Sequence, residues 1–157
     1  MEYIFFWISA AAAILLLTAV AIFKGIRLPA WIIGIASVAY SMVFEIALGD
    51  RLGLYYYISP EKSTLYILLG ALFIYPPLNI VYAVFLPESL RKALIYTAIW
   101  IAAMLVFEYV SLLTQTVVLV RWKPLPWSVV TYAATYAWVL LFYRYLSRSL
   151  RHFGSSR

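Results

Sequence analysis

At its centre the sequence carries, in residues 95–110, the run Ile95-Tyr-Thr-Ala-Ile-Trp-Ile-Ala-Ala-Met-Leu-Val-Phe-Glu108-Tyr-Val110. This run belongs to an apolar segment, residues 93–116, that is long enough to cross the roughly 30 Å hydrocarbon core of a bilayer. Glu108 lies well inside the segment. An ionisable group at such a position costs roughly 3 kcal/mol on insertion scales and by default faces a protein interior or a water-filled cavity. Glu108 is therefore the first candidate functional residue.

The composition of the whole chain indicates a membrane protein. Of its 157 residues, 66% are hydrophobic and only 11% are charged, and the mean hydropathy is +0.95. A soluble domain is about half apolar and about 25% charged. A soluble fold of this length has too little interior to bury so much apolar surface. We therefore predict an all-α integral membrane protein, with one transmembrane domain over residues 1–157.

Apolar runs separated by charged turns predict five transmembrane helices. The predicted spans are residues 3–23, 30–49, 64–86, 93–116 and 128–146. Residues 50–63, which contain three successive tyrosines, are predicted to form either a short interfacial helix or a loop folded back over the bundle.

Two prolines, Pro76 and Pro77, lie in the middle of the third span. Each lacks an N–H group and clashes with a carbonyl one turn earlier, so a kink or break is expected there. The neighbouring Tyr75, Asn79 and Tyr82 are expected to satisfy the carbonyls that the break leaves free.

Basic residues gather at the ends of the spans. Eight of the 12 Lys and Arg residues lie on one side, in the turns at residues 24–27 and 91–92 and in the C-terminal tail, and four lie on the other side. The positive-inside rule then places the N-terminus outside and the C-terminus in the cytoplasm, in a bacterial cytoplasmic membrane. It assigns the net charge of +6 to topology and lipid headgroups, and no nucleic-acid partner is predicted.

A second carboxylate, Glu45, ends another Val-Phe-Glu tripeptide near the end of the second span. It shares a helix face with Gly34, Ser37 and Ser41, and such small residues allow close helix approach in lipid. If the second and fourth spans run parallel, Glu45 and Glu108 both approach the outer half of the membrane. Two carboxylates that face one cavity repel each other, so one of them is expected to keep its proton. Such a pair can relay protons, hold a cation or act as acid and base. The structural alternative is a protonated Glu that hydrogen-bonds a neighbouring helix.

Tyrosines and one asparagine complete the candidate site. Tyrosines beside carboxylates can form a cage for an organic cation, and a helix broken at prolines can present carbonyls to a cation. The alternatives are ordinary tyrosine packing and an ordinary proline kink. The candidate ligand- or ion-binding residues are Glu108, Glu45, Tyr75, Asn79, Tyr82, Tyr109 and Tyr136. No catalytic residue, metal site or cofactor is predicted, because the chain has no cysteine, a single histidine and no phosphate-loop, HExxH or Gly-x-Ser-x-Gly motif.

Three motifs carry a resemblance to a known group of proteins. They are Glu45-x-x-Leu-Gly-Asp-x-x-Gly-Leu-Tyr-Tyr-Tyr57, Tyr75-Pro-Pro-x-Asn79 and Phe107-Glu-Tyr109. Over residues 40–146 the chain resembles a family of small uncharacterised multi-spanning membrane proteins of Gram-positive spore-forming bacteria. Its members carry one Glu before a tyrosine-rich loop and a second in the next-to-last span. The resemblance implies an architecture and a choice of residues, but no reaction.

Three functions are compatible with these features. The first is a small transporter, channel or ligand-binding subunit that accepts a proton or small cation at Glu108, assisted by Glu45, in a tyrosine-lined cavity. The second is a non-catalytic membrane partner or sensor subunit. The third is an intramembrane enzyme that acts on a lipid or isoprenoid. The expected partners are membrane lipids and either further copies of the chain or another membrane protein.

Overall fold

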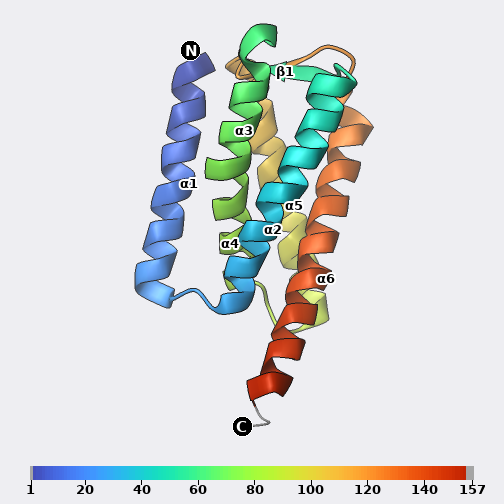
Figure 1. Ribbon diagram of the computed structural model, residues 1–157. Coiled ribbons are helices and arrows are strands. Elements are labelled where there is room, and N and C mark those ends of the chain that lie inside the picture. Colours follow the sequence, from blue (N-terminus) through green and yellow to red (C-terminus); the bar gives the residue numbers. More distant parts are fainter. Residues whose placement is uncertain (1, 155–157) are drawn as a thin grey trace.

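The computed structural model describes residues 2–154, which form a helical bundle (Figure 1). The first and the last of these residues lie at opposite ends of the bundle. Within these residues, five helices are long and apolar enough to cross a membrane. They are Glu2–Lys24, Leu28–Arg51, Pro60–Val84, Leu90–Leu113 and Pro124–Leu150. The prediction of five membrane-length helices is therefore confirmed. The side chains of Arg151 and Arg157, which add to the predicted charge asymmetry, lie outside the described residues.

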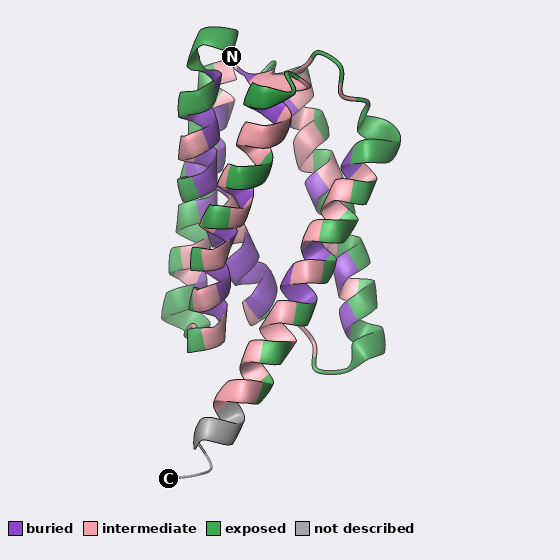
Figure 2. Ribbon diagram, turned by 45° about the vertical axis from the view of Figure 1, so that its right-hand side comes forward, coloured by how far each residue is buried: buried purple, intermediate pink, exposed green. Residues whose placement is uncertain are grey.

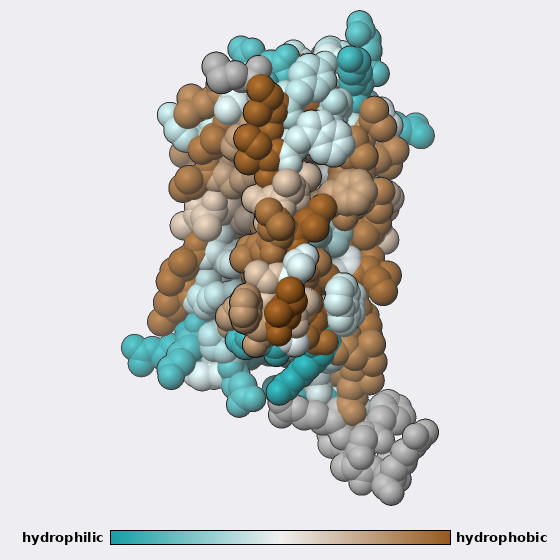
Figure 3. Space-filling view, turned by 90° about the vertical axis from the view of Figure 1, so that its left-hand side faces the viewer, coloured by the Kyte–Doolittle hydropathy of each residue, from teal (hydrophilic) through white to brown (hydrophobic). Residues whose placement is uncertain are grey.

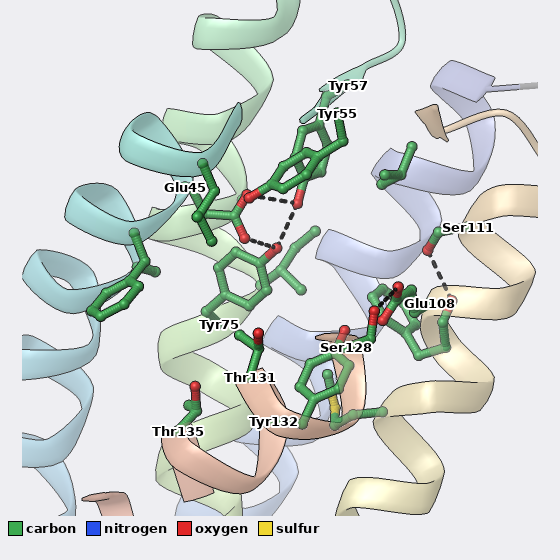
Figure 4. A pocket seen from close by; sticks show the side chains of 18 of the residues that line it. Glu45, Tyr55, Tyr57, Tyr75, Glu108, Ser111, Ser128, Thr131, Tyr132 and Thr135 are labelled. Atoms are coloured by element: carbon green, nitrogen blue, oxygen red, sulfur yellow. Dashed lines mark hydrogen bonds between the residues drawn. The ribbon is translucent and has the colours of Figure 1, made fainter. Parts of the chain in front are cut away.

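The helices follow the chain in simple up-and-down order. The elements are α1 (Glu2–Lys24), α2 (Leu28–Glu45), α3 (Ser63–Phe73), α4 (Tyr75–Val84), α5 (Leu90–Leu113) and α6 (Val129–Gly154). A π-helical turn, Ile46–Arg51, continues α2. A kinked segment, Pro124–Ser128, in which Leu125 is non-helical at φ −105° and ψ 125°, leads into α6. As a result α2 and α5 run in the same direction, with Glu45 and Glu108 near the same end of the bundle (Figures 1 and 4).

The third span is broken, as its prolines predict. α3 ends at Phe73 and α4 begins at Tyr75, with Ile74 between them at φ −109° and ψ −59°. The break falls just before Pro76 and Pro77, which occupy the first turn of α4, where a missing N–H costs least. Both prolines are buried, so the broken span stays inside the bundle.

Close contact between α2 and α4 depends on one glycine. A Cβ atom on Gly34 would lie 2.5 Å from Cδ1 of Ile80, a distance that no real methyl contact reaches. Ser37 and Ser41 are buried on the same face of α2. The predicted role of small residues in helix approach is confirmed here.

A two-stranded sheet, which the sequence did not predict, covers one end of the bundle. Strand β1 (Tyr55–Tyr57) pairs antiparallel with β2 (Val117–Leu119), with Tyr56 opposite Val118. Residues 50–63 therefore fold back over the bundle, as one of the two alternatives predicted, but they do so as a short strand followed by a 3-10 turn, Pro60–Lys62. The predicted fourth span, residues 93–116, has the right length but is displaced by three residues: α5 runs from Leu90 to Leu113, and residues 117–119 extend as a strand. We call this the sheet end of the bundle and the opposite one the tail end.

The surface has the pattern of a membrane-spanning bundle. Buried residues concentrate between the helices (Figure 2), and apolar side chains cover the middle of the face drawn in Figure 3, with hydrophilic groups at both of its ends. Large apolar residues such as Ile22, Leu15 and Ile35 are more than half exposed on the outer helix faces. An exposed apolar surface of this kind is compatible with contact with lipid.

Candidate functional site

A cavity of about 160 Å3 lies beneath the sheet, and all five spans line it. The sheet contributes its inward face: Tyr55 and Tyr57 of β1 and Val117 and Leu119 of β2 line the cavity, whereas the alternate residues of each strand do not. The polar lining consists of Ser9, Tyr40, Ser41, Glu45, Tyr55, Tyr57, Tyr75, Asn79, Glu108, Ser111, Thr116, Trp122, Ser128, Thr131, Tyr132, Thr135 and Tyr136. Two carboxylates therefore share one cavity, and its described lining includes no Lys, Arg or His side chain.

Glu45, at the end of α2, is held by three tyrosines (Figure 4). The Tyr55 hydroxyl donates to Oε2 over 2.9 Å, and the hydroxyl groups of Tyr57 and Tyr75 contact Oε2 and Oε1 at 3.2 and 3.0 Å. The Tyr57 and Tyr75 hydroxyl groups also lie 2.6 Å from each other. These four contacts take four hydrogens, of which the three phenols supply three. The cluster is complete when Glu45 itself carries a proton.

The two sheet tyrosines are held in their neutral form. Burial, reinforced by the neighbouring Glu45 carboxylate, raises the pKa of Tyr57 well above its usual value near 10. Burial and Glu45 likewise raise the pKa of Tyr55. Both phenols therefore remain hydrogen-bond donors to Glu45 throughout the physiological range.

Glu108, on α5, approaches the cavity from the other side (Figure 4). The Ser128 hydroxyl donates to Glu108 Oε1 over 2.6 Å, and Ser128 in turn accepts the indole N–H of Trp122 at 2.9 Å. The Tyr132 phenol also interacts with the Glu108 carboxylate. Glu108 is thus only partly enclosed by donors, in contrast to Glu45, and it borders an open cavity.

The two carboxylates are close enough for their charges to repel each other. In a medium of low dielectric constant such repulsion disfavours two negative charges in one cavity. A positive charge relieves the repulsion, whether it is a proton on one carboxylate or a cation between them. Glu108, which has fewer hydrogen-bond donors around it than Glu45, is the more accessible of the two to such an occupant.

The predicted site residues divide into two groups. Five of them line the cavity: Glu45, Glu108, Tyr75, Asn79 and Tyr136. Tyr82 is fully buried away from it, where its hydroxyl pairs with Thr97 at 2.7 Å. Tyr109 is 61% exposed on the outer side of α5. The structure thus does not bring Tyr82 and Tyr109 to the cavity.

The polar groups near the helix break have other partners than the freed carbonyls. Tyr75 contacts Glu45, Tyr82 pairs with Thr97, and the Asn79 side-chain amide donates to Ser37 Oγ at 3.0 Å. The expectation that they satisfy the carbonyls of the break was wrong. All three side chains of α4 form hydrogen bonds to neighbouring helices, α2 or α5.

The site residues that sequence reasoning missed include Tyr55, Tyr57, Trp122 and Ser128. The tyrosines and the tryptophan resemble a membrane-interface belt, which hides their inward direction. Alternation was the available signal, because in an extended strand Tyr55 and Tyr57 share one face and Tyr56 takes the other. Ser128 carries no signal of its own, since its position depends on the turn that leads into α6.

Among the described residues, no three His, Cys, Asp or Glu side chains lie close enough together to hold a metal ion. No protein-family model matches the chain, and comparisons with curated proteins and with solved structures find no match. The resemblance to small membrane proteins of spore-forming bacteria therefore stays a prediction.

Proposed function

We propose that this chain is a small protein of the bacterial cytoplasmic membrane that binds a small cation or a proton between its spans, as a transporter, channel or ligand-binding subunit. Its N-terminus lies outside and its C-terminus in the cytoplasm, as the excess of basic residues at the tail end favours. One observation carries the proposal: Glu45 and Glu108 border a single cavity whose described lining has no basic side chain to balance them.

The volume of the cavity limits the occupant. An engineered cavity of about 150 Å3 holds one benzene molecule, whereas pockets for drug-sized ligands begin near 300 Å3. A space of about 160 Å3 therefore accommodates a proton with its waters, an inorganic cation or an ammonium ion with a few carbons.

The lining favours positive charge. Glu108 supplies the anionic group, and the aromatic rings of Tyr132, Tyr136 and Phe107 supply faces that attract a cation. Glu45, with its ring of phenols, would accept or return a proton as the charge on Glu108 changes. Glu108 is the residue on which binding depends most.

A binding experiment separates charge from size. The thermal stability of the purified protein in detergent is measured with choline, with tetramethylammonium, and with 3,3-dimethyl-1-butanol, a neutral isostere of choline. A ligand at 100 times its Kd stabilises the folded state by about 2.7 kcal/mol. We expect stabilisation by the cations only, and its loss in Glu108→Gln. The matched control, Glu61→Gln, removes an exposed carboxylate outside the cavity and should leave binding unchanged.

A proton as the occupant has its own readout. In liposomes with a trapped pH-sensitive dye, proton flux should occur with the native protein and with Glu61→Gln, and be lost with Glu108→Gln. Indifference of both assays to Glu108→Gln would refute the proposal. Co-purification of another membrane protein, unaffected by that substitution, would then favour the partner role.

A further inference from the structure

A second hollow, of about 540 Å3, lies beside the first on the outer surface, between α2 and α6 at the sheet end. Its lining is Tyr40, Phe44, Leu48, Leu54, Arg121, Trp122, Trp127, Val130, Thr131 and Ala134. In a membrane-spanning bundle this face is turned toward lipid. We call it the α2–α6 groove.

The groove is continuous with the cavity. Tyr40, Phe44, Leu48, Trp122 and Thr131 line both. Toward the tail end the seam between the helices is closed, because the Tyr40 hydroxyl pairs with Thr135 at 3.1 Å and the Tyr40 ring stacks on Trp138 at 5.1 Å. The seam is therefore open only over the stretch next to the sheet.

The chemistry of the groove is that of a phospholipid. Its floor is apolar, with Phe44 and Val130 44% and 54% exposed. Arg121 is the one charged side chain of its described lining, and it lies at the sheet end of the groove, two residues after β2. Trp122 and Trp127, whose rings lie 6.5 Å apart, are side chains typical of the membrane–water interface.

We propose that the α2–α6 groove binds one anionic phospholipid. The phosphate lies against Arg121, and one acyl chain runs along Phe44, Leu48 and Val130, where it covers the lateral opening of the cavity. The charge of the groove is complementary to a phosphate, and its apolar floor extends away from Arg121 as a lipid chain extends from its headgroup. This inference does not depend on which cation the cavity holds.

Quenching of tryptophan fluorescence by brominated lipids tests the proposal, because bromine quenches only tryptophans within contact distance. The protein is reconstituted into vesicles with brominated phosphatidylglycerol or brominated phosphatidylcholine. The part of the quenching that disappears in Trp127→Phe reports the groove. We expect a preference for phosphatidylglycerol of about fivefold, the ratio that one cation near the membrane surface provides.

Three variants define the outcome. Arg121→Gln should bring the preference close to one, whereas Lys123→Gln, an exposed cation in the same turn but outside the groove, should keep it. Ala134→Phe adds bulk to an exposed position in the groove and should weaken quenching by both lipids. Equal quenching of the native protein by the two lipids, or equal loss of preference in Arg121→Gln and Lys123→Gln, overturns the proposal. So would a groove shielded from both lipids by a second protein copy.

Discussion

The hydroxyl groups of Tyr57, on β1, and Tyr75, on α4, lie 2.6 Å apart, and both contact the carboxylate of Glu45. The contact joins the sheet to the break in the third span. As a result the sheet above the cavity, the start of α4 in its wall and the Glu45 carboxylate form a single hydrogen-bonded unit. A change at any of the three should be felt at the others.

Replacement of Tyr75 by Phe tests this unit. The variant loses the contacts to Glu45 Oε1 and to the Tyr57 hydroxyl, while the ring keeps its packing. Hydrogen bonds between membrane helices contribute about 0.6 kcal/mol on average and at most about 1.7 kcal/mol, so we expect a loss of about 1 kcal/mol in the free energy of unfolding. Unfolding in mixed detergent micelles measures it. Tyr109→Phe, on an exposed ring, is the control and should change stability by less than about 0.5 kcal/mol.

The fit of Gly34 against Ile80 predicts a strong effect from one methyl group. Gly34→Ala would place the new carbon 2.5 Å from Ile80 Cδ1 and 2.7 Å from Ile80 Cγ1. Either the buried Ile80 side chain or the two helices then have to move, at a cost of about 1–3 kcal/mol. Gly70→Ala adds the same methyl group on α3, but its nearest neighbour is Tyr75 Cε2 at 3.7 Å, an ordinary contact. That control should be neutral or stabilising by up to about 1 kcal/mol. Equal effects of the two substitutions would contradict the described packing.

Stability should fall at high pH. Because burial raises the pKa of Tyr57 and Tyr55, the folded protein keeps phenol protons that the unfolded chain releases above about pH 10. The unfolded state then binds fewer protons, so the free energy of unfolding decreases as pH rises beyond that value. The melting temperature between pH 9 and 11 should drop more steeply for the native protein than for Tyr57→Phe. Parallel curves would show that Tyr57 ionises as freely in the folded state as in the unfolded chain.

Cysteine cross-linking tests the register of the sheet, and the chain has no cysteine of its own to interfere. Tyr56 and Val118 lie opposite each other on the face away from the cavity. Opposite residues in an antiparallel pair have Cα atoms about 4.5–5.5 Å apart, within the range that a disulfide spans. Tyr56→Cys with Val118→Cys should therefore cross-link under mild oxidation, seen as a mobility shift on non-reducing gels. In the control pair, Tyr56→Cys with Val117→Cys, the side chains point to opposite faces and should not react.

The helices were predictable because their signal is local. Each span is recognisable in the sequence as a run of about 20 apolar residues. The Pro76-Pro77 pair predicts the helix break within one turn of its observed position. The approach of Glu45 and Glu108 to one end follows from counting spans, since two spans separated by one other run parallel.

The sheet was not predictable in the same way. Its strands are three residues long and separated by about 60 residues, so neither carries enough alternation to reveal itself alone. Without the sheet, Tyr55 and Tyr57 cannot be distinguished from interfacial tyrosines. The positions of Tyr82 and Tyr109 depend on the rotation of α4 and α5 about their axes, which side-chain packing decides and hydropathy does not.

The sheet also governs which way the bundle can deform. Its backbone hydrogen bonds join the connection between the second and third spans to the connection between the fourth and fifth spans, at one end of the bundle only. Separation of α2 from α6 at that end has to break a backbone ladder, whereas toward the tail end the described contacts between these two helices are side-chain contacts such as those of Tyr40 with Thr135 and Trp138. Relative movement of α2 and α6 should therefore pivot about β1 and β2.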